Sequence, residues 1–379
     1  MLFAARAQPP LRLGVLTTLA GPAADGAGSG SVLAARMALE AWPGVPATLR
    51  SADMGERPDV GASIAQAWFD RDGVDAVVDV PNSATALAVA SIARQRDRIA
   101  LFSGAGTTLL TGAACSLNHL QWTYDTAALA ASTGRAVLAE GGDSWFFLTA
   151  DYAFGHALQA DISAVVQAGG GRVLGSAAFP NETADFSALL LQAQASRARV
   201  VALACTGAAF ETLVKQAAEF GMGRRGQMLA SPLCLLTNVR AIGLADAAGL
   251  LATEPFYWDL TPQTRAFTAR FAPRNRGIPP TMVHAGVFSA VNHLLRTVAA
   301  GADPAQGAAT VAAMKRVPAE DALFGASEVR ANGGVAHPMH LFRVKAPGES
   351  AGGWDFYQRL RTTPADQAFG RAAGCGGAG

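Results

Sequence analysis

The sequence is short of charge, of cysteine and of long apolar runs, and each shortage excludes a class of protein. Charged residues make up only 16% of the 379 residues and the formal net charge is +1, which excludes the basic surface of a nucleic-acid-binding protein. Because 50% of the residues are apolar, the chain is not disordered. The apolar segment 283–295 is interrupted by polar residues and is shorter than the ~20 residues that span a bilayer. We therefore expect a folded protein that does not bind nucleic acid.

The sequence also lacks the motifs of common catalytic and metal sites. Its 4 cysteines form no CxxC pair and have no nearby histidine ligands, which argues against a zinc site. None of the 6 histidines lies in HExxH, and a plausible GxSxG triad and a GK[ST] motif are also missing. We expect no enzyme activity, no metal and no cofactor. Cys205 and Cys234 belong to apolar segments and are predicted to be buried, whereas Cys115 and Cys375 lie in polar segments that do not suit burial.

Short apolar runs alternate with amphipathic runs, which predicts an α/β protein whose parallel sheets carry helices on both faces. The predicted strands are residues 11–19, 47–52, 76–80, 99–102, 145–149, 173–178, 200–204 and 227–230. The predicted helices between them are residues 29–41, 60–70, 85–94, 152–167, 184–195 and 207–220. The alternation is interrupted before Trp145, where a second series starts, so we expect two similar α/β units.

The segment after Glu254 has too few strands for a third domain. Two helical runs, 263–271 and 282–300, precede strand-like segments at 339–344 and 354–360. We expect this part of the chain to return and cover the first two units, so that the chain crosses between them more than once.

A glycine-rich loop after the first predicted strand could hold a dinucleotide. Gly26 and Gly28 nearly fit GxGxxG, and Asp53 lies where an acid could bind a ribose hydroxyl. However, residues 20–25 separate the strand from the first glycine, and the third glycine position is Ser31. A cytoplasmic NAD-dependent enzyme is therefore a remote alternative.

Small hydroxyl residues follow the predicted strands in the first unit. Ser83 and Thr107 are examples, and Thr206 follows a strand of the second unit. In an open α/β sheet, ligands bind beyond the carboxyl ends of the strands, where free N–H groups and helix dipoles favour an anion. Each hydroxyl could instead be a simple helix cap. Together they favour a site for a carboxylate.

The first residues leave two interpretations open. Ala5 and Ala7 occupy the positions before Gln8 where a signal peptidase requires small residues, but the apolar core of a signal peptide is missing. Residues 1–10 are either a disordered start or the remnant of an export leader.

Several segments together resemble a known family. They are "LAGPAADGAGSGS", "PNSATALA", "SGAGTT", "WTYDTAALA", "FFLTADYAFGHAL", "FYWDL", "HAGVFSAVNHLL" and "HPMHLFRVKAPGESAGGWDFYQ". In this order and spacing they resemble the type I periplasmic substrate-binding proteins of ABC importers, in the branched-chain amino acid binding branch. Within that branch, the chain is most similar to members that bind aromatic acids and other carboxylates that are not amino acids.

The resemblance implies an α/β fold of two Rossmann-like lobes, joined by three crossovers and closing on a ligand between them. We expect residues 11–126 plus 257–336 to form lobe 1. Residues 127–256 plus 337–362 would form lobe 2, and 363–379 a C-terminal tail. The resemblance also implies export to the periplasm, a monomer, a permease and ATPase complex as partner, and a disulfide between Cys115 and Cys375.

The resemblance also assigns ligand-binding residues. Hydroxyls and amides of lobe 1 would hold the ligand carboxylate, through Ser83 and Ala84 in one segment and Ala105, Gly106 and Thr107 in another. The loop 20–26 would form the cleft rim.

In lobe 2, Tyr152 would close over the ligand. Thr206 is a further candidate, and Phe210 and Trp258 are candidate aromatic neighbours of a flat ring, together with Phe154 and Tyr257.

One departure from the family bears on the ligand. Amino-acid-binding members pair the ligand ammonium with an acid in lobe 2, but residues 229–239 contain no acid. A buried cation without a partner costs several kcal/mol, so we expect an aromatic or phenylpropanoid acid. If Asp151 or Glu211 substitutes for the missing acid, the ligand is a hydrophobic or branched-chain amino acid, which remains the alternative.

Overall fold

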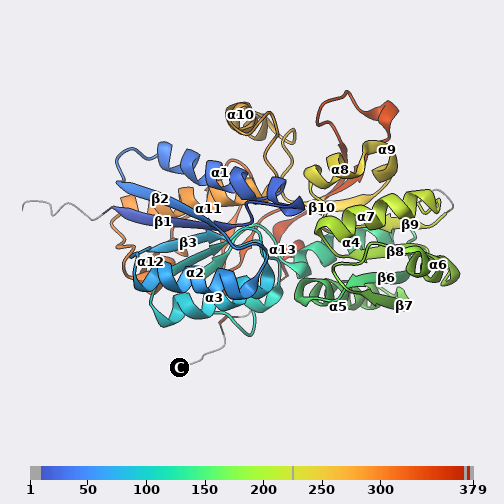
Figure 1. Cartoon of the computed structure of the whole chain (residues 1–379), viewed down its shortest axis with the longest axis horizontal. Coiled ribbons are helices and arrows are strands. Elements are labelled where there is room, and N and C mark those ends of the chain that lie inside the picture. Colours follow the sequence, from blue (N-terminus) through green and yellow to red (C-terminus); the bar gives the residue numbers. More distant parts are fainter. Residues whose placement is uncertain (1–9, 224–225, 371–373, 376–379) are drawn as a thin grey trace, which may run out of the picture.

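Two lobes lie side by side in the computed structural model, which describes residues 10–223, 226–370 and 374–375 (Figure 1). Apart from Pro10, the predicted leader remnant lies outside the described residues, as do residues 371–373 and 376–379 of the predicted tail. In the described part of the chain, we find no helix with the length and apolar character needed to cross a membrane.

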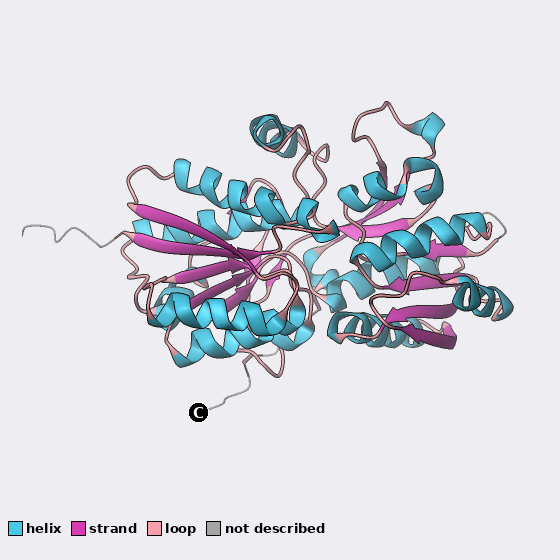
Figure 2. Cartoon of the chain, in the orientation of Figure 1, coloured by secondary structure: helices cyan, strands magenta, loops and turns pink. Residues whose placement is uncertain are grey.

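Lobe 1 contains a five-stranded parallel sheet with the order β2-β1-β3-β4-β5. Its strands are β1 (Leu11–Thr17), β2 (Ala47–Asp53), β3 (Ala76–Asp79), β4 (Ile99–Phe102) and β5 (His119–Gln121). Its helices are α1 (Gly28–Glu40), α2 (Pro58–Asp70), α3 (Ser83–Gln95), α10 (Pro262–Phe271), α11 (Met282–Ala299) and α12 (Gly307–Met314). Helices α1 and α11 pack together on one face of the sheet, and α2 and α3 pack on the other (Figure 2). Strands β3 and β4 are buried at every position, as expected for a sheet covered on both faces.

Lobe 2 contains a seven-stranded sheet with the order β16-β15-β10-β9-β8-β6-β7. Its strands are β6 (Ser144–Ala150), β7 (Arg172–Phe179), β8 (Val200–Ala204), β9 (Met228–Ala230), β10 (Leu251–Glu254), β15 (Met339–Val344) and β16 (Tyr357–Thr363). Its helices are α4 (Thr126–Ala139), α5 (Ala153–Ala168), α6 (Ser187–Ala195), α7 (Gly207–Glu219), α8 (Leu236–Ile242), α9 (Leu244–Ala247) and α13 (Ala365–Ala368). The sheet is not wholly parallel, because β15 runs antiparallel to both of its neighbours, β10 and β16. No long helix separates β15 from β16, and a short connection requires antiparallel strands.

The chain passes between the lobes three times, as the resemblance implied. It leaves lobe 1 after β5, returns after β10, and enters lobe 2 again at β15. Two pairs of very short strands lie between α12 and β15: β11 (Glu320–Asp321) with β12 (Gly325–Ala326), and β13 (Glu328–Val329) with β14 (Val335–Ala336). The segment after Glu254 therefore completes both lobes instead of forming a third domain.

The cysteines are arranged as expected. Cys115 and Cys375, which are 260 positions apart in the sequence, form a disulfide with their Cα atoms 5.5 Å apart. Cys205 and Cys234 are free and buried. The disulfide ties the end of the described chain to lobe 1.

Candidate functional site

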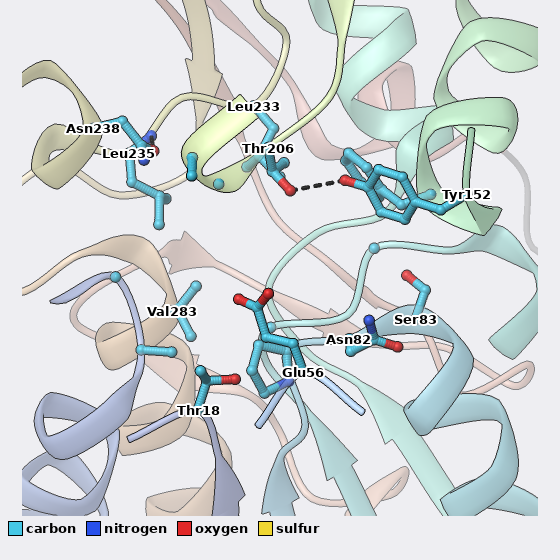
Figure 3. A pocket seen from close by; sticks show the side chains of 18 of the residues that line it. Thr18, Glu56, Asn82, Ser83, Tyr152, Thr206, Leu233, Leu235, Asn238 and Val283 are labelled. Atoms are coloured by element: carbon cyan, nitrogen blue, oxygen red, sulfur yellow. Dashed lines mark hydrogen bonds between the residues drawn. The ribbon is translucent and has the colours of Figure 1, made fainter. Parts of the chain in front are cut away.

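The strand orders of the two sheets locate a site between the lobes. In lobe 1 the order reverses between β1 and β3, and in lobe 2 it reverses between β6 and β8. Ligands of open α/β sheets bind in the crevice at such a reversal, beyond the carboxyl ends of the strands. A cavity of about 390 Å³ lies there, lined by residues that follow these four strands, and its volume is typical of a small-molecule site (Figure 3).

The segment between β3 and α3 forms one part of the lobe-1 wall. Asp79 and Val80 have φ angles of +80° and +51°, a left-handed conformation that is strained for side chains other than glycine. This turn directs Asn82 and Ser83 to the cavity. The Asn82 side chain caps α3 by accepting a hydrogen bond from the Thr85 N–H at 3.0 Å. The start of α3 is therefore held at the edge of the cavity.

The amide groups at this helix start are free. The N–H groups of Ser83 and Ala84 have no hydrogen-bond partner among the described residues. Ser83 lines the cavity, whereas the Ala84 side chain is exposed and does not. Ala84 could thus contribute only its backbone. Free amides at a helix N-terminus, together with the helix dipole, favour an anion.

A second segment, which follows β4, lies against the first. A Cβ atom on Gly104 would be 2.6 Å from the Pro81 Cα, so only glycine permits this approach. Gly104 and Gly106 line the cavity, and Ala105 and Thr107 lie on either side of Gly106, buried and outside the lining.

The amides of this second segment are also free. Within the described chain, the N–H groups of Ala105, Gly106 and Thr107 have no hydrogen-bond partner. The Gln121 side chain in β5 fixes the segment by donating to the carbonyls of Ala105 and Thr107 at 3.0 and 3.2 Å. The Thr107 hydroxyl accepts from the Leu109 N–H, so it acts as a cap. Buried amides without partners are rare in folded proteins and indicate a ligand.

Aromatic rings form the side walls. Tyr124 from lobe 1 and Phe154 from α5 both line the cavity, and both rings approach the Cα of Gly106. The Tyr124 hydroxyl donates to the Gly104 carbonyl at 2.7 Å, which holds this ring in place. Tyr152 stacks on Phe154 with 6.2 Å between ring centroids. The cavity can therefore accept a flat apolar ring.

Lobe 2 contributes a hydroxyl pair. The hydroxyls of Tyr152 and Thr206 form a hydrogen bond of 2.8 Å, drawn as a dashed line in Figure 3. Burial raises the pKa of the Tyr152 phenol, so it stays protonated at neutral pH. Four of the nine predicted ligand residues, Ser83, Gly106, Tyr152 and Thr206, thus lie together around one cavity.

The structure places Phe210 and Trp258 elsewhere. Phe210 is fully buried in the core of lobe 2, because it lies on the sheet-facing side of α7. The Trp258 indole N–H donates to the Trp354 carbonyl at 2.9 Å, and the Tyr257 hydroxyl donates to the same carbonyl. These rings hold the segment around Trp354 and do not line the cavity.

The two acids that could have replaced the missing acid of lobe 2 also lie outside the lining. Asp151 is exposed and pairs with His156 at 2.7 Å. Glu211 is half-buried, and burial raises its pKa. Glu211 accepts a hydrogen bond of 2.9 Å from Asn238, which does line the cavity.

One charged residue of the lining was missed by the sequence analysis. Glu56 follows β2, and its carboxylate points into the cavity from the lobe-1 side (Figure 3). The position of Glu56 in the sequence could have indicated it, because Glu56 follows the carboxyl end of a strand just as Ser83 does. Glu56 belongs to no recognisable motif, and of the acids near the end of this strand only Asp53 fits a known ligand-binding pattern.

The glycine-rich loop serves packing. Gly28 has φ +46°, and a Cβ there would be 2.9 Å from the Thr18 carbonyl oxygen. A Cβ on Gly30 would be 2.4 Å from the His284 Nε2. Asp53 accepts hydrogen bonds from the N–H groups of Leu19 and Gly55, so it holds two loops together. Gly26 and Ala27 line the cavity, in keeping with a cleft rim.

The fold and the cavity are those of a two-lobe protein with room for a small ligand between its lobes. Residues 10–352 match the family model for periplasmic binding proteins. The chain belongs to this family of periplasmic binding proteins, whose members are solute-binding proteins and not enzymes. Among the described residues, no group of three or more histidine, cysteine or acidic residues could hold a metal ion.

Two solved structures share more than a third of the aligned sequence. A periplasmic binding protein from Burkholderia mallei is 36% identical, with a TM-score of 0.89, and the match covers 95% of this chain and 96% of that chain. A branched chain amino acid ABC transporter periplasmic ligand-binding protein from Burkholderia xenovorans LB400 is 37% identical, with a TM-score of 0.87 and coverage of 95% and 97%.

A more distant structure contains an aromatic acid. It is a solute binding protein of an ABC transporter from R. palustris in complex with benzoate, 19% identical, with a TM-score of 0.83 and coverage of 94% and 97%. At this identity the likeness is one of fold. Among curated proteins no match was found.

Proposed function

We propose that this protein is the solute receptor of an ABC uptake system and that it captures a small aromatic carboxylate between its lobes. It would work in the periplasm, deliver the ligand to a permease and ATPase complex, and do no chemistry on it. The free amides of Ser83 and Ala84 and of residues 105–107 carry this proposal, because they form an anion site without a basic side chain. The rings of Tyr124 and Phe154 beside them support an aromatic ligand.

A hydrophobic amino acid is the second candidate ligand. Glu56 favours it, because its carboxylate lies in the cavity lining and could pair with an ammonium group. The relative from Burkholderia xenovorans, described as part of a branched chain amino acid transporter, is consistent with this alternative.

A thermal-shift screen separates the two candidates. A ligand that binds only the folded state raises the melting temperature by an amount that grows with ln(1 + [L]/Kd). We expect shifts with benzoates and cinnamates at neutral pH. If only leucine or phenylalanine raises the melting temperature, the ligand is an amino acid and not an aromatic acid. If only NAD raises it, the proposal is contradicted.

Replacing Ser83 with alanine is expected to weaken binding without affecting stability. The Ser83 side chain has no hydrogen bond within the described chain, so its hydroxyl is free to donate to a carboxylate. A hydrogen bond to a charged group contributes about 1.5–3 kcal/mol, which corresponds to a loss of about tenfold or more in affinity. Isothermal titration calorimetry with the strongest ligand of the screen measures this loss.

Ser91→Ala is the matched control, because Ser91 lies on the exposed side of the same helix. Equal affinities of Ser83→Ala and Ser91→Ala would show that Ser83 does not hold the ligand. Thr107→Ala is less informative, because loss of its cap to Leu109 also lowers stability by about 1 kcal/mol.

A further inference from the structure

Glu56 has a strained backbone and a carboxylate that points into the cavity, and a ligand that only needs its own carboxylate bound does not explain either feature. Gly55 and Glu56 have φ angles of +57° and +56°, and this left-handed pair turns the chain between β2 and α2. Glutamate is strained in this conformation. The turn brings its carboxylate to the cavity, where Figure 3 shows it pointing toward the interior.

The charge of Glu56 is not balanced within the described part of the protein. Its carboxylate has no ion pair and no hydrogen bond there, and the neighbouring Arg57 pairs with Asp59 at 2.8 Å instead. The residues that line the cavity include no arginine, lysine or histidine. Among the described residues of the lining, Glu56 is the single charged side chain. It is exposed to solvent at the mouth of the cavity, so in the free protein water solvates its charge. A ligand that fills the cavity removes part of that water, and the wall then presents a negative charge to it.

This charge constrains the ligand. A carboxylate bound at the free amides of lobe 1 is a second negative charge in the same cavity, and the two repel one another. The described polar side chains that lobe 2 contributes to the lining, among them the hydroxyls of Tyr152 and Thr206, are all neutral. A ligand group that reaches Glu56 must therefore donate a hydrogen bond.

We infer that Glu56 selects carboxylate ligands that carry a second polar group, a hydrogen-bond donor, which its carboxylate accepts. The inference rests on the proposed carboxylate site and narrows its ligand class. The donor is either a ring hydroxyl or an ammonium group, since both supply the N–H or O–H that a carboxylate accepts. An acid without a donor leaves Glu56 unpaired next to a like charge and binds more weakly.

The test uses isothermal titration calorimetry on the full protein. The ligands are benzoate, the three isomers of hydroxybenzoate, and L-phenylalanine, so that a ring hydroxyl and an ammonium are compared with an acid lacking both. The wild type is expected to bind at least one donor-bearing acid more tightly than benzoate. Glu56→Gln keeps the shape of the side chain and removes its charge. This variant is expected to bind the donor-bearing acid about tenfold more weakly than the wild type does. Its affinity for benzoate is expected to be unchanged or higher.

Glu219→Gln is the matched control, because it removes the same charge from an exposed position at the end of α7 outside the cavity. Melting temperatures of both variants report whether the fold is intact. Equal effects of Glu56→Gln on benzoate and on the donor-bearing acid overturn the inference, as do benzoate and donor-bearing acids of equal affinity in the wild type. Either result leaves the proposed binding of a carboxylate at the amides of lobe 1 unaffected. If none of the acids binds the wild type, the proposed function and the inference both fail.

Discussion

Gly106→Ala is expected to reduce ligand affinity by a hundredfold or more. The new Cβ atom would lie 2.5 Å from the Tyr124 Cε2 and 2.9 Å from the Phe154 Cε2, well inside van der Waals contact. Tyr124 cannot move away freely, because its hydroxyl is bonded to the Gly104 carbonyl. The clash therefore displaces the segment whose amides face the ligand, and a hundredfold loss corresponds to about 2.7 kcal/mol.

The same substitution is expected to lower stability by about 1–3 kcal/mol, the usual cost of an overpacked buried position. Gly44→Ala is the control, because a Cβ there meets no atom within 4 Å. Titration calorimetry and thermal unfolding of both variants separate binding from stability. If Gly106→Ala loses stability and yet binds the ligand like the wild type, the segment 104–107 is not the carboxylate site.

The lobes and part of the site could be predicted because they follow from short-range patterns. Alternating apolar and amphipathic runs indicate a parallel sheet with helices on both faces. The rule that ligands bind at the carboxyl ends of strands then selects the segments around Ser83, Gly106, Tyr152 and Thr206. All four line the cavity. Their roles toward a ligand remain a prediction.

Phe210 and Trp258, which the sequence favoured as neighbours of the ligand, lie outside the described cavity lining for two different reasons. Trp258 bonds to a carbonyl 96 positions away, which no local pattern indicates. Phe210, Leu213, Val214 and Ala217 are all buried on one side of α7. That spacing of three, four and seven residues is a helical core pattern, so the burial of Phe210 was readable from the sequence.

Strand β5 was missed because it has three residues and only its central Leu120 is apolar. Its Gln121 holds the carbonyls of the predicted anion site, which a search for apolar runs could not find. The direction of the Glu56 carboxylate depends on a left-handed turn that its sequence context does not specify. Side chains placed by such turns and by long-range hydrogen bonds need the structure.

Glu254→Gln is expected to stabilise the protein at neutral and alkaline pH. Glu254 ends β10 and is completely buried, and its two carboxylate oxygens have no hydrogen-bond partner within the described chain. The nearby Tyr357 hydroxyl donates to the Cys234 carbonyl at 2.6 Å. Burial raises the pKa of Glu254 well above its ordinary value of 4.5. Its partner across the strand pair, His340, is uncharged at neutral pH because burial lowers its pKa to about 4.

The sign of the pH dependence follows from this raised pKa. The folded protein keeps the proton on Glu254 at pH values where the unfolded chain has released it. The free energy of unfolding is therefore highest, as far as Glu254 is concerned, below pH 4.5. It falls as the pH rises from 4.5 toward the folded-state pKa of Glu254. Within that window the loss approaches about 1.4 kcal/mol per pH unit. Glutamine has no proton to release, so the variant does not have this loss.

Urea unfolding of the wild type and of Glu254→Gln from pH 4 to pH 8 measures the difference in free energy. We expect the two proteins to have similar stability near pH 4, with an advantage of the variant that grows as the pH rises. Glu219→Gln, an exposed substitution of the same chemistry, is expected to show no such growth. A constant difference across the pH range would mean that Glu254 is ionised in the folded protein. The lobe-2 sheet would then contain a buried charge with an uncharged histidine across the strand pair.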